Sequence, residues 1–366
     1  MLFNEICPED FCLWGFFMGK PDDIKFMKRA LDLAQQGYGH VNPNPLVGAV
    51  IVKNGKIIGE GYHEYFGGPH AEINALKNIK NANGATLYVT LEPCNHFGKT
   101  PPCTDRIIQE KISRVVIGLR DPNPKVNGKG IKKLRKEGIL VETGILKLET
   151  TKLNEVYIKY ITTGLPFCVI KTAMTLDGKI STVSGDSKWI SNENSRRFVH
   201  ELRRRYSAIM VGVNTIIKDN PALTDRSEFA TRKNLVRIIV DSKGRTPEKA
   251  QVFNADEAKT IFAITAGTGQ KFIDLVHHRG AETIICPEKN NQVDLTFLIK
   301  KLGEKGIDSI LIEGGSALNF SAFEEGIVDK VYAFIAPKIV GGESAKSPVG
   351  GAGFDPLNKA LNLTFE

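Results

Sequence analysis

The chain has 366 residues, more than one hydrophobic core usually contains, and we therefore expect two domains. Its composition, 42% hydrophobic and 25% charged, is typical of globular proteins, and the sequence has no run of eighteen apolar residues that would predict a membrane-spanning helix. The net charge of +8 suits anionic small substrates as well as nucleic acid, so charge alone selects neither.

The first residues differ in character from the rest of the chain. Residues 11–18 are apolar and aromatic, but acidic side chains precede them where a signal peptide carries basic ones. We expect a disordered leader over residues 1–21, with Met18 or Met27 as an alternative start. A weak membrane-associating tail is the other interpretation of this stretch. The six cysteines lack the spacing of a disulfide framework, which favours a reducing, cytoplasmic location.

The next part of the chain, residues 22–163, alternates between helical and extended patterns. Expected helices cover residues 24–34, a segment opening at His70, and residues 104–110 and 130–137. Expected strands cover residues 47–52, 57–60, 85–90, 114–118 and 140–142, with a hairpin turn at 53–56. This order suits a mixed sheet covered by helices.

A turn-like stretch at residues 160–166 precedes a second α/β region, residues 164–366. Its expected strands are 167–172, 208–211, 236–240, 260–265, 283–286, 309–312 and 331–336. Its expected helices are 192–205, 295–305 and 318–325. Residues 361–366 resemble the start of a strand with nothing after it, as a domain missing its last piece would show.

Three residues in the first region can hold one metal ion beside a carboxylate. His70 is followed two residues later by Glu72, and Cys94 follows a proline and precedes Cys103 by nine positions. One imidazole and two thiolates leave the fourth position of a tetrahedral zinc open, where water gains a pKa of about 7. Glu72 can take the water's proton and pass it to a leaving nitrogen. This order is typical of zinc deaminases, although eight residues separate the cysteines instead of two.

Several alternatives to a catalytic zinc remain open at this point. His96, between the two cysteines, could complete a closed structural zinc site, or the residues could be ordinary core side chains. A nucleic-acid deaminase would need aromatics interleaved in a basic groove, but the aromatics cluster in residues 11–18. A non-catalytic, zinc-stabilised binding module is the third possibility.

A second candidate site lies where a predicted strand runs into Gly314 and Gly315 and then a helix. Backbone N–H groups and the positive end of the helix dipole meet there, which favours an anion such as a phosphate. A plain tight turn would have the same sequence, and the G-x-G-x-x-G pattern of ordinary dinucleotide-binding domains is not present. The arginines at 196–197 and 203–205 form either a solvated helix face or a grip on a substrate phosphate.

Two sets of motifs, in order along the chain, resemble one enzyme family. His70-Ala71-Glu72 and residues 93–103 and 120–124 resemble the deaminase half of the bifunctional riboflavin-biosynthesis deaminase/reductase. Residues similar to the reductase half lie at 171–180, 187–190, 219–223 and 313–316. The resemblance covers residues 22–366, and the eight-residue insert between the cysteines agrees with this family.

The resemblance implies a cytidine-deaminase-like three-layer α/β/α domain followed by an α/β domain like dihydrofolate reductase. The first would deaminate 2,5-diamino-6-(5-phosphoribosylamino)pyrimidin-4(3H)-one, using one Zn²⁺ per site. The second would use NADPH to reduce the product to 5-amino-6-(5-phosphoribitylamino)uracil. The implied partner is a phosphorylated pyrimidine, with neither nucleic acid nor membrane, and the implied assembly is a homo-oligomer in the cytoplasm.

The resemblance also implies roles for individual residues. Zinc would be held by His70, Cys94 and Cys103, with Glu72 as the proton-transferring group. Substrate-contacting positions in the deaminase half are Asn44, His63, His96 and Lys99. Those in the reductase half are Ser187, Arg203, Leu223, Arg226 and Glu313. Positions near NADP are Ala173, Trp189, Thr215, Asp219, Ser242, Gly315, Ser316, Ala317, Leu318, Asn319, Phe320 and Ser321. The chemistry of the reduction adds Lys171 and Asp219 as candidate electrostatic or proton-transfer groups.

Overall fold

The computed structural model describes residues 21–97, 101–225 and 235–365, and it divides into two compact units, residues 1–162 and 163–366. Each unit is described by itself. The expected leader up to residue 20 and two expected substrate residues, Lys99 and Arg226, lie outside the described residues. In the described chain, no helix combines the length and the apolar character needed to cross a bilayer.

The first unit contains a five-stranded mixed sheet in the order β2-β1-β3-β4-β5. Its strands are β1 (Gly48–Lys53), β2 (Lys56–Tyr62), β3 (Thr86–Leu91), β4 (Arg114–Leu119) and β5 (Leu140–Thr143). β1 is antiparallel to both β2 and β3, and the pairs β3–β4 and β4–β5 are parallel. Asn54 and Gly55 join β1 to β2 with φ values of 51° and 73°, as a tight hairpin turn requires.

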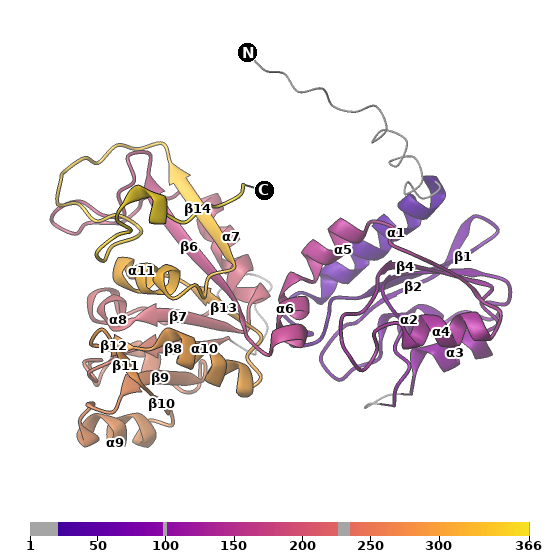
Figure 1. The fold of residues 1–366 in the computed structure, drawn as a ribbon, viewed down its shortest axis with the longest axis horizontal. Coiled ribbons are helices and arrows are strands. Elements are labelled where there is room, and N and C mark those ends of the chain that lie inside the picture. The colour runs from indigo at the N-terminus through magenta and orange to yellow at the C-terminus, as the bar shows by residue number, and fades with distance from the viewer. Residues whose placement is uncertain (1–20, 98–100, 226–234, 366) are drawn as a thin grey trace, which may run out of the picture. The chain divides into compact units, whose positions relative to one another are not determined.

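Helices cover both faces of this sheet, because alternate residues of its central strands are apolar on each side. The helices are α1 (Pro21–Ala34), α2 (Ala71–Leu76), α3 (Cys103–Gln109), α4 (Lys129–Lys136), α5 (Lys147–Leu153) and α6 (Glu155–Thr163), and a 3₁₀ turn (Gln35–Gly37) follows α1. Val50 and Val52 share a core with residues of α1, whereas Ala49 and Ile51 share another with residues of α2. These two helices lie on opposite sides of the sheet (Figure 1). The expected three-layer arrangement is therefore confirmed.

The second unit contains a seven-stranded sheet in the order β10-β9-β8-β7-β13-β6-β14, in which all neighbours are parallel. Its strands are β6 (Phe167–Thr175), β7 (Ala208–Gly212), β8 (Val236–Val240), β9 (Thr260–Thr265), β10 (Glu282–Cys286), β13 (Ser309–Ile312) and β14 (Lys330–Ala336). A separate short pair consists of β11 (Glu288–Lys289) and β12 (Gln292–Val293). Parallel strands end at one edge of the sheet, and this edge gathers most of the expected reductase residues.

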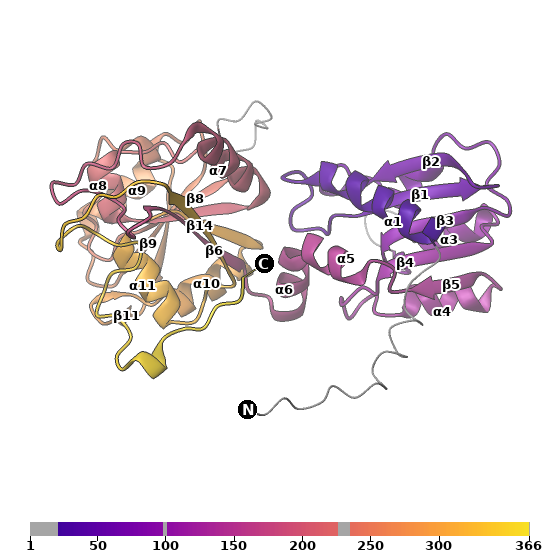
Figure 2. The same cartoon turned by 90° about the horizontal axis from the view of Figure 1, so that it is seen from above.

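The helices of the second unit again form two layers. They are α7 (Glu193–Arg205), α8 (Val213–Asp219), α9 (Gln270–His278), α10 (Leu295–Glu304) and α11 (Ser316–Glu324), with 3₁₀ turns at Gln251–Phe253 and Leu357–Lys359. One core joins the sheet to α10 and α11, which lie together on one side of it in Figure 2. Another core joins the opposite face to α8 and α9.

The structure corrects several expectations from the sequence. Pro21, expected to belong to the leader, is the first residue of α1. Residues 361–365 form no strand, although their alternating apolar side chains predicted one. Their side chains are exposed, and without a neighbouring strand an extended segment gains no ladder of hydrogen bonds. Helices α5, α6, α8 and α9 were not among the expected elements.

Candidate active sites

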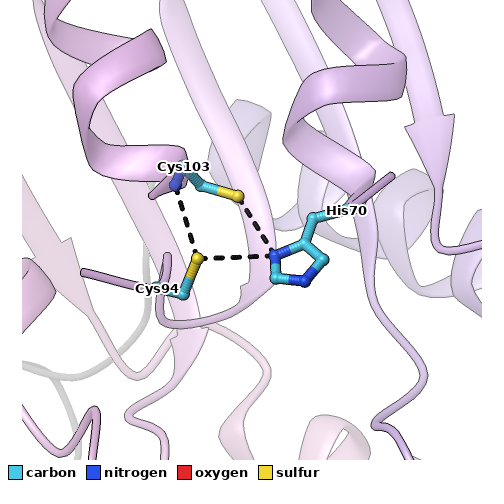
Figure 3. A group of neighbouring side chains, drawn as sticks. All are labelled: His70, Cys94 and Cys103. Carbon is cyan, nitrogen blue, oxygen red and sulfur yellow. Dashed lines mark hydrogen bonds between the residues drawn. The ribbon is translucent and has the colours of Figure 1, made fainter. Parts of the chain in front are cut away.

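Three elements of the first unit bring the metal-binding side chains together. His70 is the N-cap of α2, Cys94 follows β3, and Cys103 is the first residue of α3. The Nδ1 atom of His70 lies 3.2 Å from the Sγ atom of Cys103 and 3.4 Å from that of Cys94 (Figure 3). Within the described residues, this is the one group of three His, Cys, Asp or Glu side chains whose ligand atoms are all within 4.8 Å.

The donor set and its spacing fit zinc. Ligand bonds of about 2.0–2.3 Å in a tetrahedron place neighbouring donor atoms roughly 3.5 Å apart, close to the separations seen here. The three groups lie within hydrogen-bonding distance of one another. Hydrogen bonding from Cys103 lowers the pKa of Cys94 to about 4, and the hydrogen bond with Cys94 raises the pKa of His70 to about 9. A thiolate with a lowered pKa is the form of cysteine that binds a divalent cation. His96 is not part of this three-residue group.

Glu72 lies in the first turn of α2, beside the metal-binding group, and is only 3% exposed. Burial raises its pKa, which favours the protonated form that a proton donor needs. Glu72 and two of the metal-binding residues, His70 and Cys94, line one cavity of about 250 Å³. The cavity has room for a planar heterocycle next to the three donors.

Three of the four expected substrate residues of the deaminase half line the same cavity: Asn44, His63 and His96. The backbone carbonyl of Pro69 lies 2.9 Å from His63 Nδ1 and can only accept a hydrogen bond, so Nδ1 carries the ring's N–H and donates it. The Nε2 atom is then the acceptor for the amide of Asn44, at 3.0 Å. Burial lowers the pKa of His63, so the ring stays neutral. The Nδ1 atom of His96 is buried without a hydrogen-bond partner in the described structure.

The cavity also contains polar residues to which the sequence analysis gave no role. Asp121 is 5% exposed, and burial raises its pKa to about 6. The hydroxyl of Tyr157 donates a hydrogen bond to its Oδ1 atom at 2.9 Å, and Asn123 lines the cavity next to it. Asp121 belongs to the motif at 120–124, which was a usable signal, whereas Tyr157 lies on α6, a helix that was not predicted.

Glu92 is a buried carboxylate that joins two walls of the cavity. It accepts backbone hydrogen bonds from Asp121 (3.3 Å), Gly128 (2.9 Å) and Ile131 (3.2 Å). It also stands two residues before Cys94. The segment 121–131 is therefore fixed to the loop that carries a metal ligand.

The second unit contains a buried ion pair at the carboxyl edge of its sheet. Arg203 on α7 donates to both oxygens of Glu313, at 2.6 and 2.9 Å, and to the carbonyl of Thr224 at 2.9 Å. Burial tends to raise the pKa of Glu313, but Arg203 outweighs this and lowers it. Burial lowers the pKa of Lys171 on β6, which the charge of Glu313 partly offsets. Leu223, beside Thr224, has a φ of 54°.

The expected phosphate-binding turn has the backbone that only glycine adopts easily. Gly314 and Gly315 have φ values of 114° and 90°, and Gly315 is the N-cap of α11. Thr215 Oγ1 lies 3.8–3.9 Å from the position that a Cβ atom would take on either glycine. Free N–H groups at the start of a nine-residue helix, with a hydroxyl nearby, fit a pyrophosphate.

The other expected NADP positions differ in their surroundings. The side chains of Leu318, Asn319 and Phe320 are buried. These residues can therefore contact the cofactor through the backbone of their helix and not through their side chains. The hydroxyl of Ser242 accepts the backbone N–H of Val293 at 3.1 Å. Ala173 lies on β6 opposite a residue of β14.

Further expected residues of the reductase half are exposed. Trp189 is 63% exposed, with the guanidinium of Arg196 over its ring at 4.7 Å. Ser187, Ala317 and Asp219 are exposed, and Ser316 and Ser321 are partly buried at the start and middle of α11. The structure brings Thr215 and Gly315 together, and Arg203 and Glu313 together.

Comparisons with known proteins agree with both halves. Residues 20–119 match the cytidine and deoxycytidylate deaminase zinc-binding region, and residues 166–366 match the RibD C-terminal domain. The riboflavin biosynthesis protein RibD of Actinobacillus pleuropneumoniae is 51% identical over 346 residues, covering 94% of this chain and 91% of the relative. That of Escherichia coli is 39% identical over 334 residues, covering 88% and 89%. The chain belongs to the RibD family.

Solved structures give the same result. A Thermotoga maritima structure, named as a diaminohydroxyphosphoribosylaminopyrimidine deaminase/5-amino-6-(5-phosphoribosylamino)uracil reductase, has a TM-score of 0.78 and 44% identity, and covers 88% of each chain. Acinetobacter baumannii RibD has a TM-score of 0.82 at 35% identity, with 93% of each chain covered.

The chain is a bifunctional enzyme of riboflavin biosynthesis, with a deaminase half that precedes a reductase half. It acts on a small-molecule pyrimidine. Its cofactors are Zn²⁺ for the deaminase half and NADPH for the reductase half.

Proposed function

We propose that the first domain deaminates 2,5-diamino-6-(5-phosphoribosylamino)pyrimidin-4(3H)-one. The second domain then reduces the ribosyl group of the product to ribityl, giving 5-amino-6-(5-phosphoribitylamino)uracil. The observation that carries the proposal is the three-donor group with Glu72 buried beside it, in a cavity of about 250 Å³. The Thermotoga maritima relative, whose name contains both reactions, supports the choice of substrates.

In the deaminase half, His70, Cys94 and Cys103 would hold the zinc, which when bound would let water act as a nucleophile near neutral pH. Glu72 takes the proton of that water and returns it to the departing amino group, since an amide anion is too poor a leaving group to depart unprotonated. The raised pKa of Glu72 suits this double role. Asn44 and His63, fixed to each other, orient the pyrimidine ring.

In the reductase half, the chemistry that NADPH would supply when bound is a hydride for C1 of the ribosyl unit, once its ring is open as an imine. The nitrogen must gain a proton as the hydride arrives. Lys171, buried within reach of the charge of Glu313, can hold that proton, and Arg203 keeps Glu313 ionised. Gly315 and the start of α11 receive the cofactor's pyrophosphate through backbone N–H groups.

The remaining site assignments and the setting of the enzyme belong to the same proposal. The domain borders are residues 22–163 and 164–366, and His96, Lys99, Arg226 and Ser187 contact the phosphorylated substrates. We further propose a cytoplasmic homo-oligomer that binds no nucleic acid. No two cysteines of the described residues are joined by a disulfide bond, which suits a reducing compartment.

One assay tests both reactions and their order. The full chain is incubated with the diaminopyrimidinone phosphate, with or without NADPH, while ammonia release and NADPH absorbance are followed together. We expect ammonia in both cases, and NADPH oxidation only after ammonia has formed. The aminouracil phosphate supplied directly should oxidise NADPH without ammonia. NADPH oxidation before ammonia release would show that reduction precedes deamination. Ammonia release from a single-stranded oligonucleotide, but not from the diaminopyrimidinone phosphate, would show that the substrate is a nucleic acid.

A further inference from the structure

The loop before β1 forms one wall of the deaminase cavity, although it belongs to no helix or strand. The residues of this loop that line the cavity are Pro43, Asn44, Pro45 and Val47. The Nδ2 atom of Asn44 lies 3.0 Å from Nε2 of His63, and this is the contact proposed above to orient the pyrimidine ring. Because the loop is irregular, groups elsewhere in the chain must satisfy and hold its backbone.

The side chain of Asn154 holds this loop at a single residue, Leu46. The backbone N–H of Leu46 donates to Oδ1 of Asn154 at 2.8 Å, and Nδ2 of Asn154 donates to the carbonyl oxygen of Leu46 at 3.0 Å. The carboxamide therefore pairs with both backbone groups of one residue, as a neighbouring strand would. Asn154 is only 2% exposed, so little water competes for these two hydrogen bonds.

The main chain of Asn154 is itself fixed between two helices. Asn154 is the C-cap of α5, where its N–H donates to the carbonyl of Thr150 at 3.1 Å. Its own carbonyl accepts the N–H of Ile158, in α6, at 2.9 Å. A short side chain on a main chain held from both directions is a rigid support for the loop.

The second of these helices, α6, forms another wall of the same cavity. The residues of α6 that line the cavity are Tyr157, Tyr160 and Ile161. Because α6 begins at the residue after Asn154, one side chain joins the wall made by the helix to the wall made by the loop. The junction of α5 and α6 thereby fixes how these two walls lie relative to each other.

Two prolines stiffen the loop between its anchored residue and its substrate-contacting residue. Pro45 separates Leu46 from Asn44, and Pro43 precedes Asn44. Proline fixes its own φ and restricts the residue before it, so Asn44 has little freedom to move independently of Leu46. A shift in the backbone of Leu46 would therefore displace the amide of Asn44 from its place beside His63.

We propose that Asn154 is a positioning residue for deamination, which places the amide of Asn44 against the pyrimidine ring through the backbone of Leu46. The inference rests on the proposed function, in which Asn44 and His63 orient that ring. Asn154 is not among the described residues that line the cavity, so it acts on the substrate only through the loop. Glu72 and the metal-binding residues belong to other segments and should be intact without Asn154.

The test measures ammonia release from the diaminopyrimidinone phosphate by the full, zinc-loaded chain. Asn154→Ala should lower kcat/KM by about 10- to 100-fold, the usual effect of misplacing a binding group in an active site. The same variant should keep its zinc and should reduce the aminouracil phosphate at the rate of the parent. Asn83→Ala, at an exposed position in the loop before β3, is the matched control and should change neither rate.

A double substitution separates positioning from a purely structural role. If Asn154 acts through Asn44, then Asn154→Ala in an Asn44→Ala background should lower kcat/KM by no more than about threefold, a non-additive result. Its effect on thermal melting should be the same in both backgrounds. Hydrogen exchange gives a readout that does not depend on activity. In Asn154→Ala the segment 42–48 should exchange faster, whereas β3 should not.

Three results would overturn the role of Asn154: an unchanged kcat/KM in the folded variant, an additive loss in the Asn44→Ala background, or unchanged exchange of segment 42–48. If the alanine variant melts below the assay temperature, Asn154→Asp repeats the measurements, because it keeps the size of the side chain and the acceptor for Leu46 but lacks the donor. If the parent releases ammonia and Asn154→Ala equals it, only this inference fails. If the parent releases no ammonia from this substrate, the proposed deamination fails with it.

Discussion

Glu72 is buried and lies next to the three metal-binding side chains. A substitution at this residue can therefore test catalysis separately from zinc binding and folding. We expect Glu72→Gln to keep the fold and the zinc, because the amide is isosteric and the three donors are untouched. Deamination should fall by at least 10²–10⁴-fold, the usual contribution of general acid–base catalysis. Zinc content by atomic absorption and ammonia release check the two halves of the prediction. Loss of zinc from the folded variant would make Glu72 a ligand instead.

Asp121 should make the stability of the first domain depend on pH. Its pKa is about 6 in the folded state and about 3.9 in an unfolded chain, because burial disfavours the charged form. Between these values the folded state binds more protons than the unfolded state, so this residue's contribution to stability falls as pH rises from about 4 to 6 and is constant above. The full loss is on the order of 2–3 kcal/mol.

Asp121→Asn should remove this dependence while keeping the oxygen that accepts from Tyr157. Relative to the parent, the variant should gain stability between pH 4 and pH 7, measured by urea unfolding at both values. Asp32→Asn, at an exposed position of α1, is the control and should follow the parent. A variant that tracks the parent at both pH values would show that Asp121 titrates normally.

At the scale of elements, one carboxylate ties the segment before α4 to the loop after β3. Glu92 accepts three backbone N–H groups of the segment 121–131, and a Cβ atom on Gly130 would lie 2.1 Å from the carbonyl oxygen of Pro93. The two segments are thus in close contact along one wall of the cavity. We expect that wall to lose its shape when the carboxylate is removed.

Glu92→Ala should raise the KM of deamination by about tenfold or more with a smaller effect on kcat, because the pocket wall is affected and Glu72 is not. It leaves three buried N–H groups unpaired, each costing about 1–3 kcal/mol, so partial unfolding is a risk. Glu92→Gln retains one acceptor oxygen and should recover part of the effect. The rate of NADPH-dependent reduction of the aminouracil phosphate is the control, because it shows whether the rest of the molecule is intact. A fall in kcat alone, with KM unchanged, would contradict a role in shaping the pocket.

The glycine turn between β13 and α11 offers a similar test in the second domain. Gly315 has a φ of 90°, which a side chain adopts only with strain. Gly315→Val should raise the KM for NADPH by crowding the approach of the phosphates and leave deamination unchanged. A thermal melt must accompany the kinetics, because strain alone can unfold the turn. A folded variant with a normal response to NADPH would place the cofactor away from this turn.

For the whole molecule, two compact units with separate sites predict separable activities. Cys94→Ser removes a metal ligand and should abolish deamination. NADPH-dependent reduction of supplied aminouracil phosphate should stay within about twofold of the parent. The two rates, measured on the same preparation, decide the matter. A comparable fall in both would argue for one composite site.

Local patterns predicted many elements of this protein because each pattern reports one physical preference. The hairpin at Asn54 and Gly55 follows from residues that tolerate positive φ. The strands of both sheets follow from runs of apolar, β-branched residues. Helices α5 and α8 were missed because their sequences, KLETTKL and VNTIIKD, contain β-branched residues that favour strands over helices. The strand expected at residues 361–366 is absent from residues 361–365. An alternating apolar pattern favours an extended backbone, but a strand also needs a neighbouring strand to which it can hydrogen-bond.

The sequence by itself determined the family, the two cofactors and the metal-binding group, because those residues belong to short motifs whose spacing reflects their chemistry. Tertiary structure decided which residues from distant segments share a site. Asp121 meets Tyr157 across 36 positions, Arg203 meets Glu313 across 110, and Asn154 binds the backbone of Leu46 across 108. Such pairs depend on the order of strands in a sheet and on burial. Both are properties of the folded chain as a whole, and no local pattern in the sequence specifies them.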